Sequence, residues 1–160
     1  MGDLSEFSFV TRAFLKAYPW RRIDPVSWTP LRKPLVEANV ALVTTAGLVM
    51  PDQAPFDDKI KGGDSSYRVI PGDADVSSLI DTHRSETFDH SGIQSDPNLA
   101  FPLDRLHELA RDGRIGRVNE RHLSFMGSIT APGRLIRDTA PAVARLLVQD
   151  AVDVVLLVPV

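Results

Sequence analysis

Residues 39–45, NVALVTT, decide the fold class. The run is apolar and rich in β-branched side chains, and it ends at Ala46-Gly47. Continuous runs of this kind are typical of strands buried on both faces of a parallel sheet. A second such run, residues 152–158, follows a predicted helix over residues 135–149 after a short turn. Helix, short turn and apolar strand together indicate βα units around a parallel sheet.

Weaker patterns lie outside these two runs. The spacing of apolar side chains predicts two further helices, over residues 4–18 and 102–110. It also predicts two further strands, over residues 67–70 and 121–127. Pro141 falls inside the helix predicted over residues 135–149. Because proline cannot donate a helical hydrogen bond, we expect a kink there or a start near residue 139.

Three segments carry no single pattern. The polar stretch after Gly47, to about residue 66, indicates a long surface loop, and loops of this length are often functional. Residues 75–82 fit either a helical turn or a strand, and residues 83–100 show no clear period. The order of the predicted elements favours an α/β fold, with a mostly parallel sheet and flanking helices, similar to Rossmann and flavodoxin folds.

Two parts of the chain differ in composition. Residues 1–38 hold the first predicted helix and then a connector rich in proline and tryptophan, so we expect an N-terminal arm there. Residues 39–160 carry the α/β pattern. The whole chain has 160 residues, of which 43% are hydrophobic, which is enough to bury a core without disulfides.

Composition excludes several classes of function. The net charge is −3 and the chain has no basic stripe, so no nucleic-acid partner is expected. The absence of cysteine excludes a disulfide scaffold, a zinc–thiolate site and a cysteine nucleophile in the printed sequence. No stretch approaches the roughly 20 apolar residues of a membrane span, and no secretory signal opens the chain. We therefore expect a cytoplasmic protein with no membrane partner and no cofactor.

The carboxyl ends of the predicted strands select candidate binding residues, because sites in open α/β sheets form there. The rule selects the ends of the strands over residues 39–45 and 121–127, the segment 83–96, and whatever follows residue 158. The candidates for substrate binding are Thr44, Thr45, Gly47, Ser124, Met126 and Gly127. Ser124 lacks the two flanking glycines of a nucleophile elbow, so a hydrolase serine is not indicated.

Two histidines, His83 and His122, are candidates for general acid–base catalysis. For His122 a structural hydrogen bond is the stronger alternative, because it begins a predicted strand. His83 and His90 enclose Glu86 and Asp89, but this spacing matches no metal-binding pattern, so no metal site is predicted. Residue chemistry alone therefore names no reaction.

An ordered set of strings resembles a known family. The strings are VALVTTAGL (40–48), GGDSSYRVIPGD (62–73), the segment from His83 through Phe88-Asp89 and Gly92 to Asn98, FPLDRLHELARDGRIG (101–116), RHLSFMG (121–127) and DAVDVVLLVPV (150–160). Together they resemble the short members of the selenoprotein B family, which is related to the glycine, sarcosine, betaine and D-proline reductases. No single string is specific, but the ordered set is, and it covers nearly all of residues 28–160.

The resemblance implies an oxidoreductase component that acts on a small-molecule substrate with a thiol-redox partner protein, in a homo- or hetero-oligomer. In that family the VPV string is followed at once by selenocysteine or cysteine in a U/C-P-V-C motif. The printed chain stops at Val160. Because the selenocysteine codon UGA is ordinarily read as stop, we expect a chain truncated just before its redox residue and inactive by itself. Reading the coding DNA past codon 160 tests this expectation.

Two further expectations remain open. A strand over residues 152–158 without a following helix should expose apolar surface and make the chain poorly soluble or oligomeric. The function also has alternatives to the reductase reading, because fold does not dictate function. One is a non-catalytic α/β binding or partner subunit, and the other is a racemase-like or hydrolase-like enzyme that uses His122 or Asp89 without thiol chemistry.

Overall fold

The computed structural model describes residues 7–18, 22–85 and 90–160. The chain forms two compact units, Met1–Pro30 and Leu31–Val160. The boundary that the sequence predicts after residue 38 stays a prediction.

The first unit holds one helix, α1 (Phe9–Ala17). Ser8 caps it, because its hydroxyl oxygen accepts a hydrogen bond of 3.3 Å from the backbone N–H of Thr11. None of its side chains is buried within the unit, and Phe9 is 77% exposed. The helix predicted over residues 4–18 is thus confirmed for its described part, while residues 4–6 lie outside the described residues.

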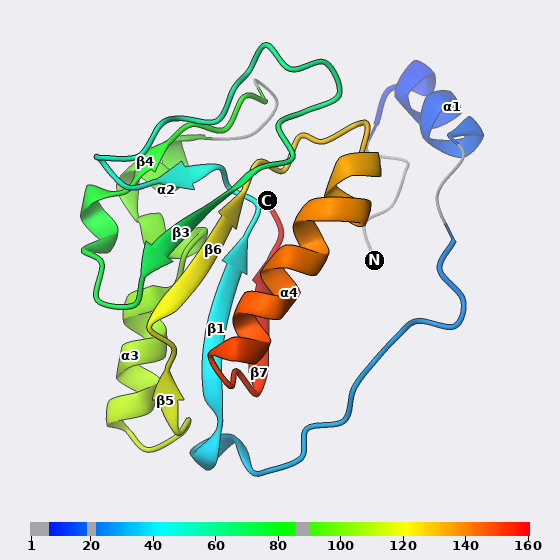
Figure 1. Ribbon diagram of the computed structural model, residues 1–160. Helices are drawn as coiled ribbons and strands as arrows, with labels where there is room; N and C mark the ends of the chain where they lie inside the picture. The colour runs from blue at the N-terminus through cyan, green and yellow to red at the C-terminus, as the bar shows by residue number, and fades with distance from the viewer. Residues whose placement is uncertain (1–6, 19–21, 86–89) are drawn as a thin grey trace. The chain divides into compact units, whose positions relative to one another are not determined.

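The second unit is built on a mostly parallel sheet (Figure 1). Its five strands are β1 (Asn39–Thr44), β3 (Tyr67–Pro71), β5 (Arg117–Val118), β6 (Arg121–Phe125) and β7 (Val154–Val158). β5, β6 and β7 all pair in parallel with β1, and β3 pairs antiparallel with β6. The predicted α/β class with a mostly parallel sheet is confirmed, and the apolar run at residues 39–45 forms the central strand.

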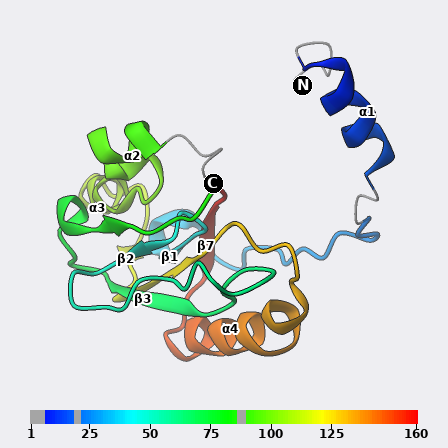
Figure 2. The same cartoon turned by 90° about the horizontal axis from the view of Figure 1, so that it is seen from above.

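Helices cover both faces of this sheet, which gives three layers (Figure 2). On one face lie α2 (His90–Ser95) and α3 (Leu103–Arg111), whose leucines Leu103 and Leu106 pack with Val40 and Leu42 of β1. On the other face lies α4 (Ala140–Gln149), whose Val143 packs with residues of β6. β1 is therefore buried from both sides, as its composition predicts.

Several short elements complete the unit. They are the 3-10 turns η2 (Leu35–Glu37), η3 (Val76–Ser78) and η4 (Pro97–Leu99), and the strands β2 (Leu48–Val49) and β4 (Ile80–Asp81), which pair antiparallel. β2 corrects the prediction that a loop begins directly after Gly47. Residues 75–82 contain both of the predicted alternatives, a helical turn followed by a strand. η4 and α2 occupy part of the stretch that shows no period in the sequence.

Pro141 shapes the helix that precedes β7. Residues Leu135–Thr139 form a π-helical turn, η5, in which the N–H of Ala140 bonds to the carbonyl of Leu135 five residues earlier. α4 then begins at Ala140, with Pro141 in its first turn. The wider turn adapts the helix to a residue without an N–H, so the expected irregularity near residue 139 is confirmed.

β7 lies at the edge of the sheet and pairs only with β1 among the described strands. Its side chains Leu156 and Leu157 are 41% and 67% exposed. The apolar exposure expected for this strand is therefore confirmed. Among the residues that the structure describes, no helix is long and apolar enough to cross a membrane.

A polar network ties β7 to the amino end of β1. The N–H of Asn39 donates to Asp153, 2.8 Å from its Oδ2, and Lys33 forms an ion pair of 2.8 Å with the same carboxylate. Asp150, in the turn before β7, accepts hydrogen bonds from Arg121 and from the Asn119 amide. The Arg121 hydrogen bond lowers the pKa of Asp150. These contacts fix the register in which β7 runs beside β1.

Candidate functional site

The carboxyl ends of β1 and β7 are joined by hydrogen bonds. The N–H of Thr45 donates to the carbonyl of Val158 over 3.1 Å. The Thr45 hydroxyl oxygen accepts from the N–H of Val160 at 2.9 Å and lies 3.3 Å from the Val160 carbonyl. Thr45 thus holds the last residues of the chain at the strand ends, which is where sites form in sheets of this kind.

Gly127, two residues beyond β6, is the point at which these ends meet. A methyl group added to it would lie 2.7 Å from the Thr45 carbonyl oxygen, 3.0 Å from the Val160 carbonyl oxygen and 3.1 Å from Nε2 of His83. Each distance is shorter than an ordinary van der Waals contact. Thr45, His83, Gly127 and Val160 therefore form one cluster, called here the strand-end site.

His83 reaches this site from the segment after β4. Gly47 makes room for it, because a side chain at Gly47 would lie 3.0 Å from both Cα and N of His83. Gly47 also adopts φ +66°, a conformation that glycine tolerates best. The carbonyl of Gly47 accepts from the hydroxyl of Thr82 at 2.6 Å, which fixes the backbone just before the histidine.

The surroundings of His83 define its protonation. The side chain is 9% exposed, and burial lowers its pKa, an effect that the nearby Asp81 carboxylate partly opposes. Nδ1 accepts a hydrogen bond of 3.3 Å from the N–H of Ser85. The neutral ring therefore carries its proton on Nε2, the nitrogen that faces Gly127.

Asp81 is a functional candidate that the sequence reasoning missed. Its Oδ1 accepts from the backbone N–H of His83 at 2.9 Å, and its Oδ2 pairs with Nδ1 of His90. The rings of His83 and His90 lie 6.3 Å apart. The aspartate two residues before a histidine is a local side-chain-to-backbone motif, and that spacing could have indicated it.

His122, the second predicted catalytic histidine, lies inside the core. It is fully buried, its ring meets Phe101 edge-on at 5.8 Å, and its Nδ1 accepts from the N–H of Leu42 at 2.9 Å. Burial lowers its pKa to about 4. The structural hydrogen bond weighed in the sequence analysis is present, and the structure does not bring His122 to the strand-end site. A catalytic role for it stays a prediction.

The other predicted binding residues divide between the site and the core. Thr45, Gly47 and Gly127 lie at the strand-end site, whereas Thr44, Ser124 and Met126 are at most 1% exposed. The hydroxyl of Thr44 donates to the Val158 carbonyl at 3.4 Å, so it supports the chain end without facing outward. Binding roles for all six residues stay predictions.

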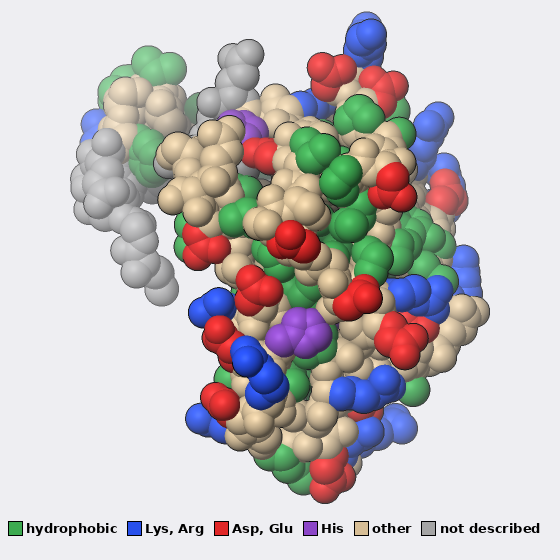
Figure 3. All heavy atoms as spheres, turned by 90° about the vertical axis from the view of Figure 1, so that its left-hand side faces the viewer, with side chains coloured by type: hydrophobic (Ala, Val, Ile, Leu, Met, Phe, Trp, Pro, Cys, Tyr) green, Lys and Arg blue, Asp and Glu red, His purple; other side chains and the backbone are tan. Residues whose placement is uncertain are grey.

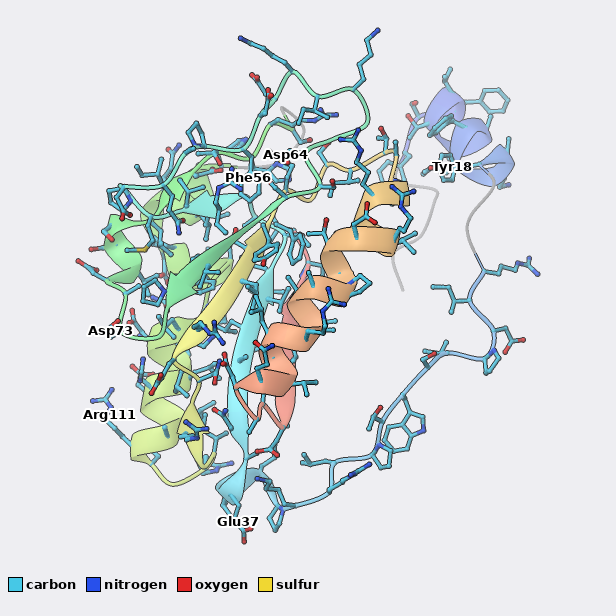
Figure 4. The ribbon with its side chains drawn as sticks, viewed as in Figure 1. Tyr18, Glu37, Phe56, Asp64, Asp73 and Arg111 are labelled. Atoms are coloured by element: carbon cyan, nitrogen blue, oxygen red, sulfur yellow. The ribbon has the colours of Figure 1, made fainter. Side chains whose placement is uncertain are left out.

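An apolar pocket of about 300 Å³ adjoins the strand-end site. Thr45 and Gly127 line both. A larger hollow of about 750 Å³, lined by Lys61, Asp64 and Arg134 among others, lies between the loop before β3 and the start of η5. In Figure 4, Asp64 and Phe56 lie near the carboxyl ends of the strands, whereas Glu37 lies at the amino end of β1.

Another hollow, of about 480 Å³, lies away from the strand-end site and is lined by Gly72, His107 and Asn119 among others. Acidic and basic side chains are interspersed over the face of the molecule that Figure 3 shows. Within residues 7–18, 22–85 and 90–160, no three His, Cys, Asp or Glu side chains are arranged to hold a metal ion. Asp89, named for the hydrolase-like alternative, lies outside the described residues.

Comparisons with known proteins find relatives that are named as subunits or components of reductases. The model of the glycine/sarcosine/betaine reductase selenoprotein B family matches residues 8–160. The chain is 38% identical over 133 residues to the D-proline reductase subunit gamma of Acetoanaerobium sticklandii, covering 83% of this chain and 53% of that protein. It is 31% identical over 144 residues to the glycine reductase complex component B subunit gamma of Symbiobacterium thermophilum, covering 88% of this chain and 32% of that protein.

A third relative is the sarcosine reductase complex component B subunit beta of Peptoclostridium acidaminophilum, at 29% identity over 147 residues, 90% of this chain and 33% of that protein. The chain thus spans about half the length of the D-proline reductase subunit and a third of the other two. No solved structure matches it. Because the family match extends over nearly the whole chain, this protein belongs to the glycine/sarcosine/betaine reductase selenoprotein B family.

Proposed function

We propose that the chain forms the strand-end part of the active site in a glycine/sarcosine/betaine/D-proline reductase-like component. A thiol or selenol would act there on a small substrate. The observation that carries the proposal is the convergence of Thr45, Val160 and Nε2 of His83 on Gly127. The family resemblance puts selenocysteine or cysteine directly after the VPV string, and a residue following Val160 would leave the sheet at this convergence.

His83 suits chemistry with a sulfur or selenium anion. Its lowered pKa favours the neutral ring at pH 7, and its Nδ1 is occupied by the N–H of Ser85. The Nε2–H can then donate a hydrogen bond to a thiolate or selenolate, which favours the anion and lowers the pKa of the attacking group. We therefore propose His83, rather than the enclosed His122, as the group that activates the redox residue.

The reaction class fixes the partners that are needed. Reductive cleavage breaks one C–N bond and forms one C–H and one N–H bond, so it consumes two electrons and two protons. Two thiols supply both when they join as a disulfide. The printed sequence holds no cysteine, so the thiols would come from a partner protein and from the residue after Val160. The relatives are named as subunits or components of reductases, and we propose an assembly of the same kind for this chain.

A chain extended after Val160 by Cys-Pro-Val-Cys tests the proposal. The first added cysteine should react with iodoacetamide as a thiol of lowered pKa, and His83→Gln should slow that alkylation at pH 7 while leaving the fold intact. With dithiothreitol as donor, the extended chain should cleave the C–N bond of at least one of four substrates. Cleavage releases ammonia or an amine from glycine, sarcosine or betaine, and it opens the ring of D-proline to a linear amino acid. The matched control carries Ser-Pro-Val-Ser and should be inert.

The alternatives give different results in the same experiment. A non-catalytic subunit would bind a reductase component, and its added cysteine would have an ordinary pKa that His83→Gln does not change. A racemase-like or hydrolase-like enzyme would turn over substrate without dithiothreitol and without the added cysteines. Either outcome would refute the proposed function.

A further inference from the structure

We infer that the apolar pocket beside Gly127 binds the hydrocarbon part of the substrate, and that this substrate carries several adjoining carbon atoms in a ring or a branched alkyl group. The inference deepens the proposed function and rests on it, because the pocket is taken to serve the reaction at the strand-end site. The pocket has a volume of about 300 Å³. Glycine would leave nearly all of it empty.

The walls of the pocket favour hydrocarbon and disfavour charge. They come from Phe125, Met126, Ile129, Pro132, Leu135 and Ala140. None of the described residues that line the pocket is charged. An ammonium or carboxylate moved into such surroundings without a partner is strongly penalised. Methylene groups gain free energy from the same transfer. The pocket therefore distinguishes substrates by their apolar part.

The polar side chain that lines the pocket already forms hydrogen bonds within the protein. The Thr45 hydroxyl provides the only side-chain polar group among the lining residues, and it bonds with the backbone of Val160. Thr45 and Gly127 belong to both the pocket and the strand-end site. Ring carbons seated against Met126 would thus keep the amine nitrogen, whether in the ring or attached to it, at the edge shared with Val160 and His83, where the C–N bond would be cleaved.

The size of the pocket depends on two helical positions. Leu135 lies in η5, and Ala140 is the first residue of α4 and is exposed. A large side chain at Ala140 can enter the pocket without disturbing the buried sheet. Ala144 lies one helical turn further along α4, is also exposed, and does not line the pocket. The pair Ala140→Phe and Ala144→Phe is therefore a matched test and control.

The experiment uses the 160-residue chain with ¹³C-labelled methionine methyl groups. Only three methionines occur, so Met126 reports on the pocket and Met50 serves as an internal reference. We expect cyclopentylamine and D-proline to shift the Met126 signal, with an apparent Kd on the order of ten-fold or more below that of glycine or betaine. Ala140→Phe should abolish the response, and Ala144→Phe should preserve it.

Two results would overturn the inference. One is a Met126 signal that does not respond to either ring compound. The other is a response that Ala140→Phe leaves unchanged. Because binding is measured without any thiol, failure of turnover in the cysteine-extended chain would refute the proposed function and leave this result standing. Conversely, equal rates of D-proline cleavage by the cysteine-extended chain with and without Ala140→Phe would support the function and refute the pocket assignment.

Discussion

Lowering the pH should destabilise this fold through His122. Burial holds the pKa of this histidine at about 4, against 6.5 for an exposed ring. Below pH 6.5 this histidine is therefore protonated in the unfolded chain but stays neutral in the folded chain. The free energy of unfolding is highest above pH 6.5 and decreases as the pH falls toward 4. The difference of 2.5 between the two pKa values corresponds to about 3 kcal/mol at full protonation, and to about 2 kcal/mol at pH 5.

The assay is urea unfolding at pH 7.5 and pH 5, followed by circular dichroism, for the parent and for His122→Asn. Asparagine can keep the acceptor for the Leu42 N–H but does not titrate. The variant should be the less stable chain at pH 7.5, and the parent's advantage should shrink by about 2 kcal/mol at pH 5. Leu123→Ala, at a buried site without a titratable group, should cost the same at both pH values. If the difference between parent and His122→Asn is also the same at both, His122 is not held neutral by burial.

The other predictions concern the strand ends, the polar network and the exposed edge. Gly127→Ala should lower the Tm and reduce the free energy of unfolding by about 1–3 kcal/mol, because the added methyl group would lie 2.7 Å from the Thr45 carbonyl oxygen. Gly133→Ala is the control: no atom lies within 4 Å of its added methyl group, so its Tm should equal that of the parent. Asp150→Asn should lower the free energy of unfolding in urea by about 1 kcal/mol, because its carboxylate pairs with Arg121. Most of this cost should disappear in an Arg121→Met background, where only the Asn119 hydrogen bond remains to be lost; additive costs would contradict the pairing. Leu157→Lys should reduce self-association in sedimentation experiments, and a parent chain that is already monomeric would contradict the role of the exposed edge.

The main elements are predictable from the sequence because their signals are local and strong. The run at residues 39–45 holds four consecutive apolar residues followed by two β-branched threonines, and a central strand covered on both faces buries such a run. The irregularity near Pro141 is predictable in the same way, because a proline inside a helix lacks the N–H donor whatever the rest of the fold is. The antiparallel pairing of β3 with β6 has no such signal, because strand direction is set by contacts between distant residues.

The shortest strands could not be predicted from the sequence, because their local signal is too short. β2 and β4 have two residues each, too few to show the alternation that identifies a strand. They pair because the chain turns at Gly47, which has a positive φ, and this turn places Leu48 opposite Asp81 in the antiparallel register. That pairing also sets the position of His83, two residues beyond β4. The position of His83 is therefore hard to predict, because it depends on the two strands with the weakest sequence signal.

The two candidate histidines show why residue type alone could not assign the site. Burial lowers the pKa of both His83 and His122. Both also use Nδ1 to accept a backbone N–H, so both carry the proton of the neutral ring on Nε2. They differ in what that nitrogen faces. Both Nε2 atoms are buried, and that of His122 lies in the core, where its ring packs against Phe101. In His83 it lies beside the backbone of Gly127 at the strand ends, and this position is why we propose His83, not His122, as the acid–base group of the site.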